Sequence, residues 1–139
     1  MKYDFEIPKR GVLQKDADGP DENKTHHAWF LIAEGFAQFS PDPYRKVGAV
    51  LIYENRLISY GWNAPNGSIE IKDYTDRELV NERITHAEAN CVVSASHIIP
   101  LNRRAEACLY VTKKPCDLCE KRIKTLGFSF KYVDLPEGA

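Results

Sequence analysis

Residues 85–98 read THAEANCVVSASHI and residues 115–119 read PCDLC, and these two stretches decide the fold and the chemistry of the chain. The first stretch predicts a helix with Thr85 as its N-cap, and Pro100 ends it. In the second, Pro115 opens a predicted helix that ends near Gly127, following the usual preference for proline first and glycine last. Both stretches therefore place polar residues in the first turn of a helix.

One histidine and two cysteines lie at these helix starts, and they are His86, Cys116 and Cys119. A catalytic zinc ion takes three protein ligands and keeps a fourth position open for water. A helix N-terminus carries partial positive charge, which favours the thiolate form that a metal needs. We therefore predict a Zn²⁺ site formed by these residues. Glu88 follows His86 by two positions and does not share its helix face, so we expect Glu88 to move protons rather than bind the metal.

The two remaining cysteines bear on the alternatives for this site. A structural zinc site would usually need a fourth ligand, and Cys91 and Cys108 are available in the sequence. Cys91 lies in mid-helix and Cys108 opens an apolar strand, so we expect both to behave as small buried apolar residues. A thiol oxidoreductase is a more distant alternative, because its C-x-x-C motif normally follows the first strand of the domain, whereas this one comes late.

The rest of the chain alternates between helical and strand-like segments. The apolar spacing predicts a helix from Thr25 to Phe39, and strands are predicted at residues 47–53, 57–63, 108–112 and 128–133. The first two strands form a hairpin, and a long polar connection over residues 64–84 contains a helical turn near residues 76–82. This order predicts a single α/β domain over residues 1–139, with residues 1–24 as an irregular N-terminal arm.

Composition and charge exclude several classes of protein. The net charge is -1 and the pI is about 6.4, whereas a protein that coats nucleic acid is usually strongly basic. No stretch approaches the roughly 20 apolar residues that span a bilayer, and residues 1–24 lack the apolar core of a signal peptide. We therefore expect a soluble, cytoplasmic protein without membrane partners, in which the C-x-x-C motif serves a metal rather than a disulfide.

The combination of H-x-E with P-C-x-x-C resembles the signature of the cytidine and deoxycytidylate deaminase superfamily. Three further stretches support the resemblance: Asp42-Pro43 followed by VGAV at residues 47–50, GWNAPNG at residues 61–67, and LYVT at residues 109–112 leading into Pro-Cys. GWNAPNG is similar to the Gly-Tyr-Asn-Gly-x-Pro-x-Gly stretch of deoxycytidylate deaminases. The resemblance runs from about Trp29 to Val133 and implies a three-layer α/β/α fold with a mixed five-stranded sheet.

The resemblance also implies roles for individual residues. His86, Cys116 and Cys119 ligate zinc, and Glu88 moves protons between water, base and departing ammonia. Asn63 matches the asparagine that contacts the sugar, and the backbone amide of Ala87 matches the one that contacts the base. Candidates for phosphate binding, from their place before the first strand, are Arg45 and Lys46. The family implies a homo-oligomer, in which neighbouring subunits often complete the pocket.

The favoured function is hydrolytic deamination of dCMP to dUMP. Trp62 and Ala64 depart from the deoxycytidylate stretch, and Cys91 stands where that branch has alanine; these departures concern the substrate and not the metal site. One alternative is a deaminase of transfer RNA or single-stranded DNA, which needs a basic groove. The acidic connection at residues 70–82 and the pI argue against a nucleic-acid partner. The second alternative is a non-catalytic zinc-binding module, against which the intact Glu88 argues.

Overall fold

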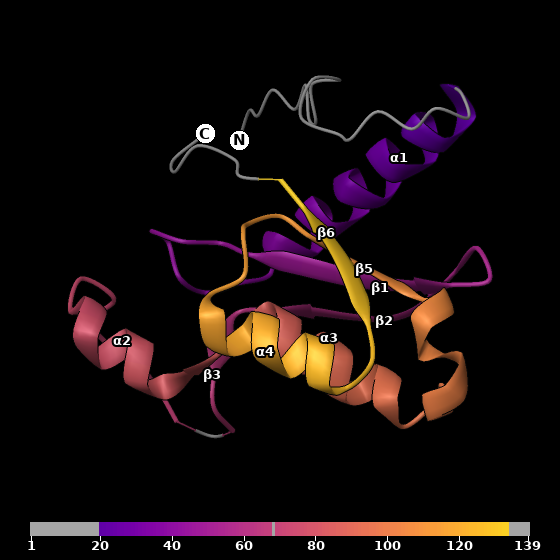
Figure 1. The fold of residues 1–139 in the computed structure, drawn as a ribbon. Helices are drawn as coiled ribbons and strands as arrows, with labels where there is room; N and C mark the ends of the chain where they lie inside the picture. Colours follow the sequence, from indigo (N-terminus) through magenta and orange to yellow (C-terminus); the bar gives the residue numbers. More distant parts are fainter. Residues whose placement is uncertain (1–19, 68, 134–139) are drawn as a thin grey trace.

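The computed structural model describes residues 20–67 and 69–133. Helix α1 spans Pro20–Ala37, so it begins before the predicted Thr25. The last residues of the predicted N-terminal arm are therefore helical, and residues 1–19 of that arm lie outside the described residues. Figure 1 shows α1 lying diagonally across one side of the sheet.

The predicted hairpin is confirmed as strands β1, Gly48–Tyr53, and β2, Arg56–Trp62, which pair antiparallel. Its loop contains Glu54 and Asn55, whose φ angles are 53° and 59°. Two consecutive residues with positive φ form the tight turn whose twist matches that of the flanking strands. The hairpin places β2 at one edge of the sheet and leaves β1 in its interior.

The second half of the chain supplies the remaining strands. Strand β5, Cys108–Val111, pairs antiparallel with β1, and β6, Ser129–Tyr132, pairs parallel with β5. Helix α4, Asp117–Thr125, connects β5 to β6, as a parallel pair requires. The sheet order is β2-β1-β5-β6, and this mixed sheet confirms the predicted fold class.

The main sheet has four strands in the described part of the chain, where five were expected. Two short strands, β3 at Ala64–Pro65 and β4 at Ile84–Thr85, instead pair with each other as a separate ribbon. This ribbon joins the ends of the long connection, which contains helix α2, Arg77–Arg83. The fifth strand was implied by the resemblance, whereas the sequence pattern itself indicated the four strands of the sheet.

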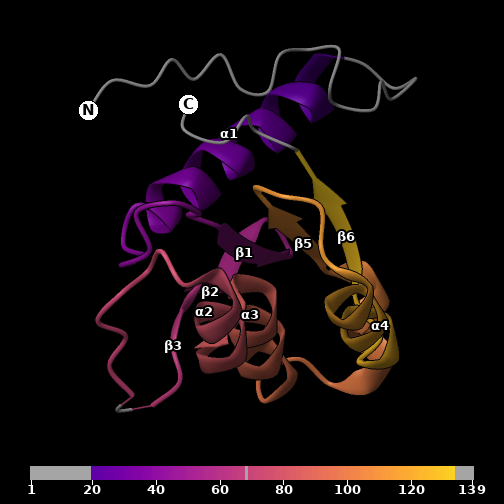
Figure 2. The ribbon, with the colours of Figure 1, turned by 90° about the vertical axis from the view of Figure 1, so that its left-hand side faces the viewer.

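Helices cover both faces of the sheet. Helix α3, Ala87–Ser96, and α4 lie on one face, and α1 lies on the other, as Figure 2 shows. A short 3₁₀-helix, η1 at Leu101–Glu106, links α3 to β5. One apolar cluster joins α3 and α4 to the sheet through Val92, Ile123 and Leu109, and a second joins α1 to it through Phe30 and Val50. These two cores establish the three-layer α/β/α arrangement.

Two glycines in the sheet allow helices to approach its backbone closely. A Cβ atom at Gly48 would overlap the carbonyl oxygen of Ala33 in α1. A Cβ atom at Gly61 would stand 2.6 Å from the carbonyl oxygen of Ala87, at the first turn of α3. Neither position leaves room for a side chain, so these contacts fix how α1 and α3 lie on the sheet.

Candidate functional site

His86 is the N-cap of α3, one residue later than the predicted cap Thr85. Thr85 belongs instead to β4, where it pairs with Ala64, and its hydroxyl donates to the side chain of Asn66. The side chain of His86 makes no capping hydrogen bond to the helix, so its ring is available to the site. The imidazole therefore projects from the place where an extended strand turns into a helix.

Cys116 is the N-cap of α4 and also makes no side-chain capping bond. Its carbonyl oxygen accepts the first bond of the helix from the amide of Glu120, at 2.8 Å. Cys119 follows one turn later, and its side chain is buried at 6% exposure, whereas Cys116 is exposed. The predicted helix is present but begins at Asp117, two residues after the predicted Pro115, and its start presents one buried and one accessible thiol.

The two helix starts bring the predicted zinc ligands together. The Nδ1 atom of His86 lies 3.2 Å from the sulfur of Cys119 and 3.8 Å from the sulfur of Cys116. All three ligand atoms lie within 4.8 Å of one another. Nitrogen and sulfur atoms on one tetrahedral zinc ion stand about 3.5 Å apart. The donor set and its spacing therefore fit zinc with a fourth position left for water or substrate.

The thiols of the site must lose protons to bind a metal. Burial raises the pKa of Cys119, and the nearby negative charges of Glu88 and Cys116 raise it further. A metal ion provides the positive charge that this environment lacks, because it binds the thiolate and not the thiol. We therefore expect zinc binding to release protons and to weaken as the pH falls.

Of the two cysteines outside this group, Cys91 is buried as expected from the sequence, whereas Cys108 is only partly buried. Cys91 and Cys108 are free thiols, and neither belongs to the group of three potential metal ligands found among the described residues. Cys91 is fully buried in α3, and burial raises the pKa of its thiol to about 12. Its sulfur lies 3.3 Å from the hydroxyl oxygen of Ser59, so it packs α3 against β2.

Glu88 lies in the first turn of α3, next to the metal ligands but outside their group. Its side chain is 4% exposed, and burial raises the pKa of the carboxyl. A hydrogen bond from its own backbone amide and the charges of His86 and Arg45 lower this pKa, but by less than burial raises it. A carboxyl with a raised pKa takes up and releases protons more readily near neutral pH than an exposed one does. The position of Glu88 therefore suits proton transfer at the metal.

Asn63 is buried at 3% exposure and lies directly after β2. Its side-chain oxygen accepts from the amide of Val47 at 2.9 Å, and its side-chain nitrogen donates to the carbonyl oxygen of Arg45 at 2.8 Å. The carbonyl oxygen of Asn63 also accepts from the hydroxyl of Ser40, at 2.8 Å. Asn63 thus fastens the segment of residues 40–47, hereafter the entry loop, to the end of the hairpin.

The entry loop carries the two predicted phosphate candidates, and the structure separates them. The ammonium of Lys46 donates to the carbonyl oxygen of Ser40 at 2.6 Å, so it is used within the loop itself. Arg45 has an exposed side chain, and its charge lowers the pKa of Glu88. The guanidinium of Arg45 therefore lies within electrostatic reach of the site.

An ion pair between Asp42 and Arg77 was not predicted from the sequence. The two guanidinium nitrogens of Arg77 donate to the two carboxylate oxygens of Asp42, at 3.0 and 2.8 Å. Asp42 is 1% exposed and lies in the entry loop, whereas Arg77 is the first residue of α2. No local pattern could have paired residues so far apart in the sequence, although a buried aspartate is a sign that a partner exists.

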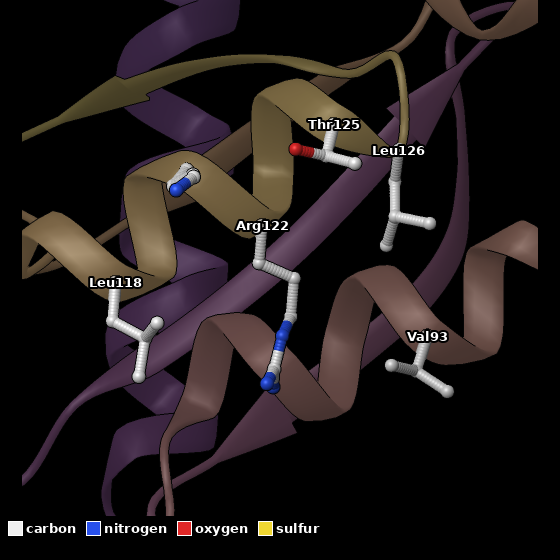
Figure 3. A pocket seen from close by; sticks show the side chains of 6 residues that line it. Val93, Leu118, Arg122, Thr125 and Leu126 are labelled. Carbon is white, nitrogen blue, oxygen red and sulfur yellow. The ribbon is translucent and has the colours of Figure 1, made fainter.

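The surface between α3 and α4 carries a groove that is separate from the predicted site residues. Its walls are apolar with a cationic rim, and Figure 3 shows the side chain of Arg122 extending from α4 toward α3. The residues that line it are Val93, Leu118, Lys121, Arg122, Thr125 and Leu126. None of the predicted site residues is among those that line the groove.

Comparison with known proteins agrees with this geometry. The sequence profile of the family described as "Cytidine and deoxycytidylate deaminase zinc-binding region" matches residues 23–133. The chain belongs to this family. Its cofactor is accordingly zinc, for which His86, Cys116 and Cys119 are positioned. As a member of the cytidine and deoxycytidylate deaminase family, it is a deaminase.

Individual relatives show how broad this family is. An uncharacterized deaminase of Aliivibrio fischeri is 35% identical over 106 residues, which are 75% of this chain and 68% of that protein. A tRNA-specific adenosine deaminase of Buchnera aphidicola is 29% identical over 113 residues, 77% of this chain and 67% of that protein. A probable deoxycytidylate deaminase of Drosophila melanogaster is 30% identical over 159 aligned positions, 94% of this chain and 75% of that protein.

The fold also has a solved counterpart. The dCMP deaminase of the cyanophage S-TIM5, in complex with dCMP and dUMP, matches with a TM-score of 0.66 and 24% identity, and covers 82% of each chain. At this identity the similarity establishes the fold rather than the substrate. Among the helices that the structure describes, none is long and apolar enough to cross a membrane.

Proposed function

We propose that this deaminase hydrolyses the exocyclic amine of a cytosine nucleotide, dCMP, to give dUMP and ammonia. The observation that carries the proposal is the buried Glu88 beside a His-Cys-Cys group, with the guanidinium of Arg45 in electrostatic reach of Glu88. An anionic substrate favours such a cation at the entrance, and the carboxyl supplies the proton transfers.

Each residue has a distinct part in the proposed reaction. His86, Cys116 and Cys119 hold zinc, which when bound supplies a water whose pKa lies near neutrality. Glu88 accepts one proton from the attacking water and passes it to the ring nitrogen of the base. It then takes the remaining proton from the same oxygen, now bonded to the base, and gives it to the amine, which leaves as ammonia as the C–N bond breaks. The buried position of Glu88 excludes bulk water, so these transfers stay between the carboxyl and the substrate.

The substrate contacts are proposed for three residues. The amide of Ala87, at the positive end of α3, binds the base. The bonds of Asn63 to the entry loop use one side-chain amide hydrogen and one oxygen lone pair. The second amide hydrogen and the second lone pair contact the sugar. Arg45 binds the phosphate, whereas Lys46 stabilises the entry loop through Ser40. This division makes Arg45 the residue that distinguishes a nucleotide from a nucleoside.

Similarity to tRNA-specific adenosine deaminases supports a second candidate, a base in transfer RNA or single-stranded DNA. Such an enzyme flips its base into the pocket and holds the flanking strand in a basic groove. Binding of a labelled oligonucleotide at low and at moderate salt separates the two candidates, because phosphate contacts weaken steeply with salt. The dCMP proposal expects weak binding at both salt concentrations.

We further propose that the protein is a cytoplasmic homo-oligomer. The groove between α3 and α4 and the family resemblance support self-association, and the free thiols are consistent with a reducing compartment. Light scattering of the zinc-loaded protein and cell fractionation test the two statements separately. A monomer at all accessible concentrations would refute the first, and recovery in the membrane or secreted fraction would refute the second.

The experiment that tests the proposed function measures ammonia release and ultraviolet spectra with cytidine, deoxycytidine, their monophosphates, 5-methyl-dCMP and adenosine. Zinc-loaded wild type and Glu88→Gln are compared, since the amide keeps the shape of the side chain and removes its proton transfer. The proposal predicts turnover of dCMP by the wild type and loss of that turnover in the variant. Equal activity of the variant would favour a different catalytic residue. Silence of the zinc-loaded wild type across the panel would refute the small-molecule substrate and favour first a nucleic-acid substrate and then the non-catalytic module.

A further inference from the structure

The carboxylate of Asp42 accepts four hydrogen bonds. Besides Arg77, it accepts from the backbone amides of Tyr44 and Arg45, at 2.9 and 3.3 Å. With the side chain at 1% exposure, leaving this charge without partners would be costly. Burial alone would raise the pKa of Asp42, but Arg77 and the two amides together hold it below its ordinary value. The carboxylate is therefore a fixed charged centre around which the entry loop turns.

Arg77 comes from a different part of the chain, at the start of α2. Both of its terminal guanidinium nitrogens donate to Asp42, and one of them also donates to the carbonyl oxygen of Tyr74, at 2.9 Å. Its guanidinium lies 5.7 Å from the ring centre of Tyr44. Arg77 thus links the long connection and α2 to the entry loop, and Figure 1 shows α2 set apart from the sheet.

The peptide groups of Arg45 are held from two sides as a result. Its amide donates to the carboxylate of Asp42, and its carbonyl oxygen accepts from the side chain of Asn63. The backbone of this residue is therefore fixed, while its side chain is exposed and its charge acts on Glu88. Of the two bonds that hold Arg45, the one to Asp42 depends on a residue outside the hairpin and the entry loop, namely Arg77.

Building on the proposed function, we propose that Arg77 is a positioning residue, which holds Asp42 so that the entry loop presents Arg45 to the phosphate of the substrate. Arg77 does not touch the reacting atoms in this account. Its loss leaves the zinc ligands and Glu88 in place but frees the amides of Tyr44 and Arg45. The expected defect is therefore one of phosphate recognition and not of chemistry.

The test uses Arg77→Met, which keeps an unbranched aliphatic stem and removes both the charge and the fork of donors. Arg77→Lys restores the charge without the bidentate geometry. Arg83→Met is the matched control, because Arg83 is exposed in the last turn of the same helix. All variants are zinc-loaded full-length chains, and their thermal stabilities are measured alongside.

Two readouts separate positioning from a merely structural role. Hydrogen exchange at the amides of Tyr44 and Arg45 should be faster in Arg77→Met than in wild type or Arg83→Met. The kcat/KM for dCMP should fall by ~10-fold through KM, with kcat and the activity on deoxycytidine unchanged, because a weakened phosphate contact lowers binding of substrate and transition state alike. Arg77→Lys should recover part of the loss. In the background of Arg45→Met, the further change Arg77→Met should cost little, because both act on one contact.

The outcomes decide the proposal and the function separately. Unchanged exchange at both amides in Arg77→Met would overturn the positioning role. Equal losses for dCMP and deoxycytidine, or additive losses in the double variant, would overturn it as well. If the wild type turns over neither substrate, the proposed function fails, and the exchange experiment alone decides the role of Arg77: faster exchange supports it, and unchanged exchange overturns it.

Discussion

Substitution of Gly61 by alanine tests how the sheet places the catalytic helix. The new Cβ atom would stand 2.6 Å from the carbonyl oxygen of Ala87 and 3.1 Å from the Cβ of Asn90, whereas ordinary contacts begin at 3.4 Å. The first turn of α3 would have to move from β2 by about 0.8 Å, and His86 and Glu88 would move with it. Overpacking of this kind costs about 1–3 kcal/mol of stability.

The displacement should affect function more than stability. A misplacement of about 1 Å at a catalytic group lowers turnover by as much as ~100-fold. We expect Gly61→Ala to fold, to bind zinc more weakly, and to lose ~10- to 100-fold in kcat/KM for dCMP. The assays are denaturant unfolding, zinc titration and ammonia release.

Gly35→Ala is the matched control, because a Cβ at Gly35 meets no atom within 4 Å and the residue lies inside α1. It should stabilise the protein by about 0.5–1 kcal/mol and leave turnover unchanged. A Gly61→Ala protein with wild-type stability, zinc affinity and turnover would refute the claim that the contact between β2 and α3 sets the position of Glu88.

Three further outcomes follow from the buried titratable groups and the metal site. Burial raises the pKa of Glu34 to about 7, so its proton stabilises the fold below about pH 4.5, and this contribution is lost as the pH rises to 7. In denaturant unfolding, Glu34→Gln should remove this pH dependence and be more stable than wild type above pH 7 by up to about 3 kcal/mol. The absence of that gain would contradict the raised pKa of Glu34. A thiol reagent should label Cys116 in the native apoprotein and Cys91 only after unfolding, and zinc should protect Cys116; early labelling of Cys91 would contradict its burial. Removal of zinc by a chelator should lower the melting temperature of both wild type and Glu88→Gln, since Glu88 is not a ligand; failure of the variant to bind zinc would contradict that role.

Much of the fold follows from local patterns in the sequence. The hairpin, α3, α4 and the strands beside them were predicted within a few residues, because their apolar spacing and their prolines and glycines act locally. The metal ligands were found for a different reason, since the motifs place His86 and Cys116 at helix starts whatever the rest of the chain does.

Features that depend on distant contacts were not predictable in this way. The pairing of β3 with β4 moves Thr85 out of the cap position, and nothing near Thr85 in the sequence signals that partner. The ion pair of Asp42 with Arg77 joins two segments that the sequence shows only as a loop and a helical turn. Lys46 and Arg45 look equivalent in the sequence, and the structure distinguishes them by the bond from Lys46 to Ser40 and by the charge of Arg45 acting on Glu88.

We propose that this chain replaces the amine of a cytosine nucleotide with oxygen from water, with zinc held by His86, Cys116 and Cys119 and protons moved by Glu88. The most direct test of this reaction is the mass of the product when zinc-loaded wild type and Glu88→Gln are incubated with dCMP in ¹⁸O-labelled water. We expect dUMP with one ¹⁸O atom in the base from the wild type, and unchanged dCMP from the variant and from the chelated wild type. Unchanged dCMP from the zinc-loaded wild type, or labelled dUMP formed equally fast by Glu88→Gln, would contradict it.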